Sequence, residues 1–167
     1  MNKRHIVAGL LTALSLLGFA SSSSAEATKT DDVQILFVQS ATGGSYDGKT
    51  LTLNDVPSTT YFSDRPKRIV GHVATAGFVD QWAKGADSFK ADPPNAVLSV
   101  LGADGANDSV VELTNPRING NQISYQAKVL DGTPPKAFKT ASLFIDGHGG
   151  AFIGGMVAGS LLSNMRR

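Results

Sequence analysis

The sequence predicts a mainly β protein, an antiparallel sandwich or barrel of about seven or eight short strands with one short helix. Three observations support this fold class. Short runs of β-branched and apolar residues recur along the chain, and turn dipeptides such as Asn119-Gly120 and Asp47-Gly48 separate them. Residues 122–130 alternate between polar and apolar side chains, as a strand with one buried face does.

Eight segments have the composition of strands. Residues 33–39 are rich in β-branched and aromatic side chains, and Leu51 and Leu53 alternate with polar neighbours. The run 96–101 is continuously apolar, which predicts a strand buried on both faces. We expect the last four strands to form a meander. The eight segments are residues 33–39, 50–54, 59–63, 68–72, 96–101, 109–113, 122–130 and 138–145.

One helix is predicted over residues 75–84. Thr75 can cap its start and Gly85 can end it. A helix of about ten residues is not stable alone in water, so we expect it to lie on the sheet with its apolar stripe buried. That stripe comprises Phe78, Val79 and Trp82.

Residues 1–25 have the features of a secretory signal peptide. Lys3 and Arg4 form a basic start, residues 6–20 are apolar, and Ala25 suits the cleavage position. We therefore expect an exported protein, periplasmic or extracellular, with a flexible N-terminus over 26–32, a β domain over 33–146 and a glycine-rich tail over 147–167. Removing Lys3 and Arg4 lowers the 15 basic residues to 13, against 14 acidic residues.

The composition excludes several classes of function. The chain of 167 residues has no cysteine, which excludes disulfides, zinc knuckles, thiol catalysis and a lipoprotein anchor. A net charge close to zero gives no basic surface for nucleic acid, so no nucleic-acid partner is expected.

The tail from 147 to 165 contains no Asp, Glu, Lys or Arg, and Arg166-Arg167 follows it. Pairs of glycines stand four residues apart, at 150 and 154 and at 155 and 159, a spacing that lets helices approach closely in membranes. The firmly apolar part, 151–162, is shorter than the roughly 20 residues of a typical span. Three interpretations stay open: a flexible or locally packed tail, a peripheral membrane or self-association helix, and a spanning anchor.

The segment from Gly43 to Thr50 matches the phosphate-binding formula G-x-x-x-x-G-K-[ST]. A phosphate-binding loop leads into a helix, whereas Leu51 and Leu53 here alternate like a strand and Pro57 follows soon after. We interpret the match as coincidental and expect a glycine-rich hairpin with no nucleotide site.

The densest polar segment is Tyr61-Phe62-Ser63-Asp64-Arg65-Pro66, with Arg68 and His72 close behind. An arginine fork could hold a carboxylate or phosphate, and Asp64 with His72 could hold a divalent metal, although their spacing selects none. The alternative is a structural turn in which Asp64 pairs with Arg65. The candidate ligand-binding residues are Asp64, Arg65, Arg68, His72 and Trp82, with Asp64 and His72 as candidate metal ligands.

Three segments together resemble an uncharacterised family of small secreted bacterial proteins: Tyr61 to Pro66, Asp92-Pro93-Pro94-Asn95 with the following residues to Val100, and Ser142 to Asp146. The resemblance covers roughly residues 33–146 and implies an exported, self-contained domain. No activity is known for the family, so the resemblance implies no mechanism.

These patterns favour a non-enzymatic β domain of the bacterial envelope that binds a small ligand, an ion or an envelope protein. One alternative is a small metal-assisted or acid–base enzyme that uses Asp64 and His72, with Asp80 or Asp92. Another is a membrane-associated assembly protein that acts through residues 147–165. No cofactor is predicted beyond an optional divalent metal.

Overall fold

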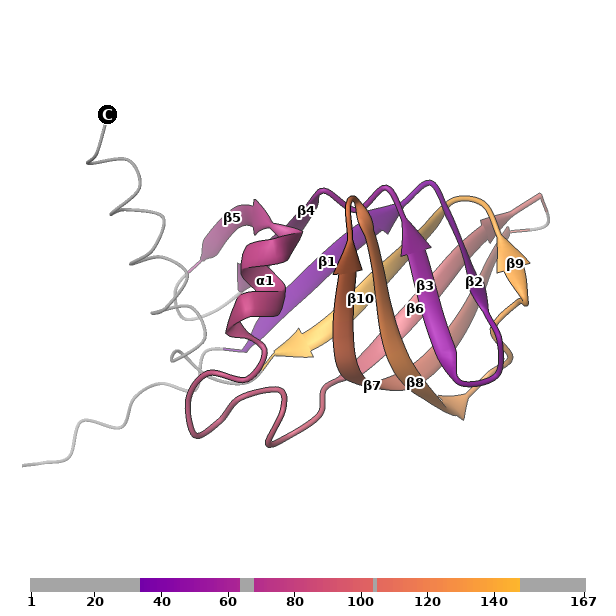
Figure 1. The fold of residues 1–167 in the computed structure, drawn as a ribbon. Coiled ribbons are helices and arrows are strands. Elements are labelled where there is room, and N and C mark those ends of the chain that lie inside the picture. Colours follow the sequence, from indigo (N-terminus) through magenta and orange to yellow (C-terminus); the bar gives the residue numbers. More distant parts are fainter. Residues whose placement is uncertain (1–33, 64–67, 104, 148–167) are drawn as a thin grey trace, which may run out of the picture.

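A computed structural model describes residues 34–63, 68–103 and 105–147, which form ten strands and one helix (Figure 1). All strand pairs are antiparallel and belong to one sheet, in the order β5-β4-β1-β10-β6-β7-β8-β3-β2-β9. The strands in chain order are β1 (Ile35–Ala41), β2 (Gly43–Tyr46), β3 (Thr50–Asn54), β4 (Ser58–Ser63), β5 (Ile69–Ala74), β6 (Asn95–Gly102), β7 (Gly105–Asn119), β8 (Gln122–Asp131), β9 (Ala137–Phe138) and β10 (Ala141–Gly147).

The mainly β prediction with one short helix is confirmed. Ten strands replace the seven or eight expected, and a single sheet that is not closed replaces two packed sheets or a barrel. Two strands are absent from the prediction. One is β2, whose sequence Gly-Gly-Ser-Tyr has little strand character of its own, and the other is the two-residue β9, which the predicted segment 138–145 did not separate from β10.

The sheet curls because two of its strands are interrupted at a bend. One residue, Thr42, separates β1 from β2, and the same antiparallel register pairs Ala41 with Ala141 and Gly44 with Phe138. The ladder of β1 with β10 thus continues into the ladder of β2 with β9. In Figure 1, β7, β8 and β3 cross in front of β1 and β10.

Side chains from both halves of the curled sheet form one core. Alternate residues point inward, so Phe37 on β1, Leu98 on β6 and Leu143 on β10 are fully or almost fully buried. On β8 the predicted inward face is confirmed, since Ile123, Tyr125 and Ala127 are buried. Such alternation is what an antiparallel strand with one buried face requires.

A chain of buried polar side chains crosses this core. The Tyr125 hydroxyl donates to Gln39 Oε1 at 2.8 Å, and Gln39 Nε2 donates to Thr59 Oγ1 at 3.0 Å. Thr59 Oγ1 in turn lies 3.2 Å from Thr75 Oγ1. Burial raises the pKa of Tyr125, and its hydrogen bond with Gln39 opposes this only in part. The bonds join β8, β1, β4 and the helix across the interior.

Two expectations for the later strands were wrong. In β6 only Ala96, Leu98 and Val100 are buried, and Leu101 is 65% exposed, so this strand does not bury both faces. Strands β6, β7 and β8 do lie side by side in order, but β10 lies between β1 and β6 instead of beside β8. The short strand β9, which pairs with β2, leads the chain into β10 at its position between β1 and β6.

Helix α1 (Thr75–Gln81) is shorter than the predicted 75–84 and covers one end of the curled sheet (Figure 1). Thr75 is not its cap, because Ala74 occupies that position without a side-chain hydrogen bond and Thr75 is buried. Phe78 and Trp82 point into the core, where Trp82 lies 4.9 Å from Phe89 between ring centroids. Gly85 follows with a φ of +91°, the left-handed conformation expected after a helix.

The ends of the chain fall largely outside the described residues. This applies to the predicted signal peptide, to residues 26–32 and to the tail beyond Gly147. Gly147, with which the tail was expected to begin, is the last residue of β10. No helix among the described residues is both long and apolar enough to cross a membrane.

Candidate ligand-binding cavity

A cavity of about 560 Å³ with several polar lining residues lies at one end of the sheet. It lies where β1 and β6 begin and where β4 and β10 end. These four strands are neighbours in the order β4-β1-β10-β6, and antiparallel pairing brings their ends to the same edge. The described lining residues are Gln34, Ile35, Leu36, Phe62, Ser63, Asp92, Pro93, Asn95, Asp146 and Gly147.

All three segments that carry the family resemblance reach this cavity. Phe62 and Ser63 come from the first segment, Asp92, Pro93 and Asn95 from the second, and Asp146 from the third. Sequence distances of about 30 to 80 residues separate the three segments, so only the sheet topology brings them together. The cavity is therefore the place where the chain's singled-out motifs form one surface.

Local structure fixes the walls of the cavity. The Ser63 hydroxyl accepts a hydrogen bond from the Ile69 backbone N–H at 3.2 Å, which holds the end of β4 against β5. The Pro94 carbonyl accepts the Leu113 N–H at 3.0 Å, and this anchors the proline segment beside β7. A Cβ atom on Gly147 would lie 2.5 Å from Phe37 Cε2, so glycine lets β10 lie close to the core here. The proline segment is thus held beside β7, and Asp92, Pro93 and Asn95 line the cavity.

The described lining residues of the cavity include two carboxylates and two carboxamides. Asp92 and Asp146 contribute carboxylates and Gln34 and Asn95 contribute amides, while none of the described lining residues is Lys, Arg or His. Carboxylates and amide oxygens accept hydrogen bonds from ammonium or hydroxyl groups and can also bind hard cations. Within the described ranges, however, no three His, Cys, Asp or Glu side chains are grouped closely enough to hold a metal ion.

The site residues predicted from the sequence are not brought together by the described structure. Asp64 and Arg65 lie outside the described residues, so their binding role and the proposed metal pair of Asp64 with His72 stay predictions. Arg68 and His72 are exposed. His72 points away from the core. Ile69 and Val73, on the opposite face of β5, are the residues of this strand that pack against the core.

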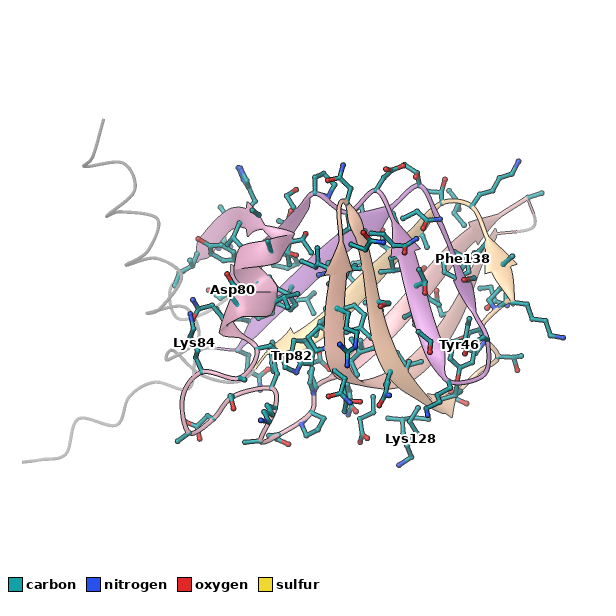
Figure 2. The ribbon with its side chains drawn as sticks, viewed as in Figure 1. Tyr46, Asp80, Trp82, Lys84, Lys128 and Phe138 are labelled. Carbon is teal, nitrogen blue, oxygen red and sulfur yellow. The ribbon has the colours of Figure 1, made fainter. Side chains whose placement is uncertain are left out.

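Trp82 is a core residue in this fold. Only 5% of it is exposed, and its ring packs against Phe78, Phe89 and Tyr125. Figure 2 shows Trp82 at the end of α1 toward the sheet, while Asp80 lies on the helix itself. Trp82 and His72 therefore belong to different faces of the structure, and the expected grouping of the two is not observed.

A second cavity, of about 550 Å³, lies beside the end of α1 and includes part of the Trp82 side chain. Asn115 lines it with a φ of +49°, at an irregularity in the pairing of β7 with β8. Two of its polar side chains have partners, because Asn115 Nδ2 donates to Gln126 Oε1 and Thr114 Oγ1 donates to the Gln126 carbonyl, and Lys90 also lines this cavity.

The segment that matches the phosphate-binding formula forms a hairpin, as expected. Gly43 to Tyr46 is strand β2, and strand β3 starts at Thr50 in place of a helix. The Asp47 carboxylate accepts the backbone N–H groups of Lys49 and Thr50, and these bonds hold the pKa of Asp47 below its usual value. The turn therefore satisfies its own amides through Asp47.

Asp146 and Gln34 were not singled out as site residues from the sequence. Their positions at the ends of β10 and β1 matter only once those strands pair, and Leu36 lies opposite Asp146 in that ladder. The inclusion of Asp146 in the resembling segment was the one signal that could have drawn attention to it. Comparisons of the chain with protein-family models, curated proteins and solved structures gave no match.

Proposed function

We propose that this protein is an exported β domain of the bacterial envelope that binds a small ligand or ion in the cavity at the ends of β4, β1, β10 and β6. The ligand carries ammonium or hydroxyl groups, or is a hard cation. The observation that carries the proposal is the convergence of Asp92, Asp146 and the two amides of Gln34 and Asn95 on one cavity.

The physical argument is one of complementarity. An open cavity of about 560 Å³ has the size of small-ligand sites, which span roughly 300 to 1,000 Å³. Its two carboxylates favour positive charge, and a hydrogen bond to a charged group contributes about 1.5 to 3 kcal/mol. Leu36, Phe62 and Pro93 add an apolar wall that can contact the carbon skeleton of an organic ligand.

A binding role suits the described cavity better than catalysis. The acid–base alternative needs its groups within hydrogen-bond reach of a common substrate. Asp92 lines the cavity, whereas His72 and Asp80 lie elsewhere, on β5 and α1. The Ser63 hydroxyl accepts a backbone N–H and has no histidine beside it among the described lining residues.

Nuclear magnetic resonance titration tests the proposal. Glucosamine, which has an ammonium group and several hydroxyls, and calcium chloride are the two probes. We expect at least one of them to shift the backbone amide signals of residues 34–36, 62–63, 92–95 and 146–147 together. Shifts confined to other regions, or no shifts with either probe at millimolar concentration, would contradict the proposal.

A further inference from the structure

The two edges of the sheet differ in how well they are protected against pairing with a further strand. Edge strands present free backbone groups, and proteins commonly block them with very short strands, prolines or lysines. At one edge, β9 has two residues, and the prolines and lysines around it are Pro134, Pro135, Lys136 and Lys139. At the opposite end of the sheet, the six residues of β5 include no Pro, Lys, Asp or Glu, and among the described residues only β4 pairs with it (Figure 1). Strand β5 is therefore an edge that can accept another strand.

The hydrogen bonds of β5 with β4 show which of its backbone groups face the open edge. The Ile69 N–H donates to Ser63 Oγ on β4 at 3.2 Å, and the ladder between the two strands is regular over all six residues. Successive residues of a strand direct their N–H and C=O groups to opposite edges. Because Ile69 directs its groups toward β4, Val70 and His72 direct theirs to the open edge, and the side chains of both are exposed. The backbone groups of Val70 and His72 are therefore placed to bond a further strand.

We propose that β5 pairs antiparallel with β5 of a second copy of this chain, so that the two sheets become continuous. A two-fold axis through the middle of the paired strands relates the copies, which is the commonest symmetry of homo-oligomers. Residues opposite each other in an antiparallel pair point to the same face, and a shift of one residue would exchange the faces. The register must therefore match the half-buried face of β5 in one copy with the same face in the other. This face consists of Ile69, Gly71 and Val73.

Charge and side-chain type favour the register that has Gly71 on the axis. Val70 of each copy then lies opposite His72 of the other, and the edge-facing groups of such a pair exchange both of their hydrogen bonds. Ile69 lies opposite Val73, which brings β-branched apolar side chains together on the half-buried face. The neighbouring registers instead oppose two histidines, or a histidine and the arginine that precedes β5, and like charges opposite each other destabilise a sheet whenever the histidine is protonated.

Glycine suits the position on the axis. The two residues there form a pair without hydrogen bonds, which is the closer of the two kinds of antiparallel pair, with Cα atoms about 4.5 Å apart. Tyr61 lies opposite Gly71 in the ladder of β4 with β5, and a Cβ atom on Gly71 would lie 2.6 Å from the Tyr61 hydroxyl oxygen. The Tyr61 ring thus occupies the place of a side chain at Gly71. Two glycines can therefore pair on the axis without leaving this face of the edge uncovered.

Single cysteines in the full chain test the pairing and its register, and the absence of native cysteine removes background disulfides. A mixture of Ile69→Cys and Val73→Cys proteins should form a mixed disulfide dimer on mild oxidation, identified by its mass, because these residues oppose each other across the axis. Each variant alone should form little dimer, since its two cysteines would lie about 13 Å apart along the strands, beyond the reach of a disulfide. Absence of the mixed dimer, or equal dimer yields in the mixture and in the single variants, would overturn the proposal.

Sedimentation velocity of the full chain gives an independent readout. Wild type should form a dimer that dissociates on dilution, because a contact between two short strands is small. Val70→Pro removes the edge-facing N–H and leaves the bonds of β5 to β4 in place, and it should weaken association at least about tenfold, since each dimer loses two backbone hydrogen bonds. Val70→Thr is the matched control, because it keeps the N–H and should dimerise like wild type. A wild type that stays monomeric up to millimolar concentration, or equal association of all three proteins, would overturn the proposal.

Discussion

Gln39 is the residue on which the interior polar chain depends, because it is fully buried and uses both ends of its amide. Its oxygen accepts the Tyr125 hydroxyl and its nitrogen donates to Thr59. Breaking one buried bond leaves the other partner unsatisfied at a cost of about 1 to 3 kcal/mol, whereas removing both partners can cost little. These buried hydrogen bonds therefore fix which strands face each other across the core.

We expect Tyr125→Phe and Gln39→Met each to lower the free energy of unfolding by about 1 to 3 kcal/mol. The double variant should cost at least about 0.5 kcal/mol less than the sum of the two, because neither partner of the Tyr125–Gln39 bond is then left unpaired. Urea unfolding of the four proteins measures this difference. Strictly additive costs would show that the Tyr125–Gln39 bond contributes nothing.

Burial of Tyr125 also predicts an alkaline dependence of stability. In the unfolded chain this phenol ionises near its ordinary pKa of 10.0, while in the folded protein burial raises its pKa above that value. Above pH 10 the unfolded state therefore binds fewer protons, and stability falls by about 1.4 kcal/mol per pH unit from this group. Below pH 10 the group causes no such loss.

Unfolding experiments from about pH 9 to pH 11.5 on wild type and Tyr125→Phe measure this dependence. The variant should lose stability less steeply above pH 10. Parallel curves over the whole range would contradict the burial of a neutral phenol.

At the scale of elements, α1 is stable because its apolar side joins the aromatic cluster. Phe78 contacts Phe37, Trp82 and Phe89, and seven residues of helix would be unstable without such packing. The sequence predicted this element and its stripe well, because apolar spacing near 3.6 is a local signal. It did not predict the buried position of Thr75, which depends on Thr59 of a distant strand.

Trp82→Ala should lower the free energy of unfolding by about 3 to 5 kcal/mol, the usual cost of removing a buried aromatic ring. Trp82→Phe keeps a ring in the cluster and should cost less. Calorimetric titration of Trp82→Phe with the probe that binds wild type should give an unchanged affinity. A large loss of affinity in this folded variant would instead support the sequence-based assignment of Trp82 to a ligand site.

Strand β2 was missed because its signal is not local. Two glycines open it, and it becomes a strand through pairing with β3 on one side and β9 on the other. A Cβ on Gly44 would overlap the Thr52 carbonyl oxygen and would lie 2.5 Å from the Phe138 ring. Glycine at this position is what permits three backbones and one aromatic ring to pack here.

Gly44→Ala should therefore destabilise the protein by about 1 to 3 kcal/mol through overpacking. Gly102→Ala is the matched control, since its nearest obstacle is a backbone oxygen at 3.5 Å and the change should stay within about 0.5 kcal/mol. Thermal unfolding of both variants provides the comparison. If both variants lowered the stability equally, the close contacts around Gly44 would not be what excludes a side chain there.

At the scale of the molecule, the sequence predicted strands and turns but not their order in space. The alternation in β8 is a short-range feature, and that prediction agrees with the structure. A tight turn also follows β7, but its two loop residues are Gly120 and Asn121, because Asn119 pairs with Gln122. The prediction that the run 96–101 is buried on both faces was wrong, because an apolar composition does not show which faces of a strand are covered. Leu101 is exposed. The placement of β10 beside β6 comes from long-range pairing that no local pattern records.

The candidate site depends on that long-range pairing. The sequence singled out Asp92 in a resembling segment and as an optional group of the enzyme alternative, and Asp146 only for its place in a resembling segment. Both become cavity residues because β6 and β10 are neighbours with their ends at one edge. These residues come together only when the whole sheet has formed. The sequence alone therefore predicted a site among residues near one another in the chain, from Asp64 to Trp82.

Calorimetric titration with the probe that binds wild type, applied to Asp92→Asn, Asp146→Asn and the control Asp131→Asn, tests the cavity most directly. Asp131 is exposed at the end of β8 and does not line the cavity. Loss of one charge-assisted hydrogen bond should weaken binding roughly 10- to 100-fold in each cavity variant and leave the control unchanged. Equal affinities in all four proteins would contradict binding in this cavity.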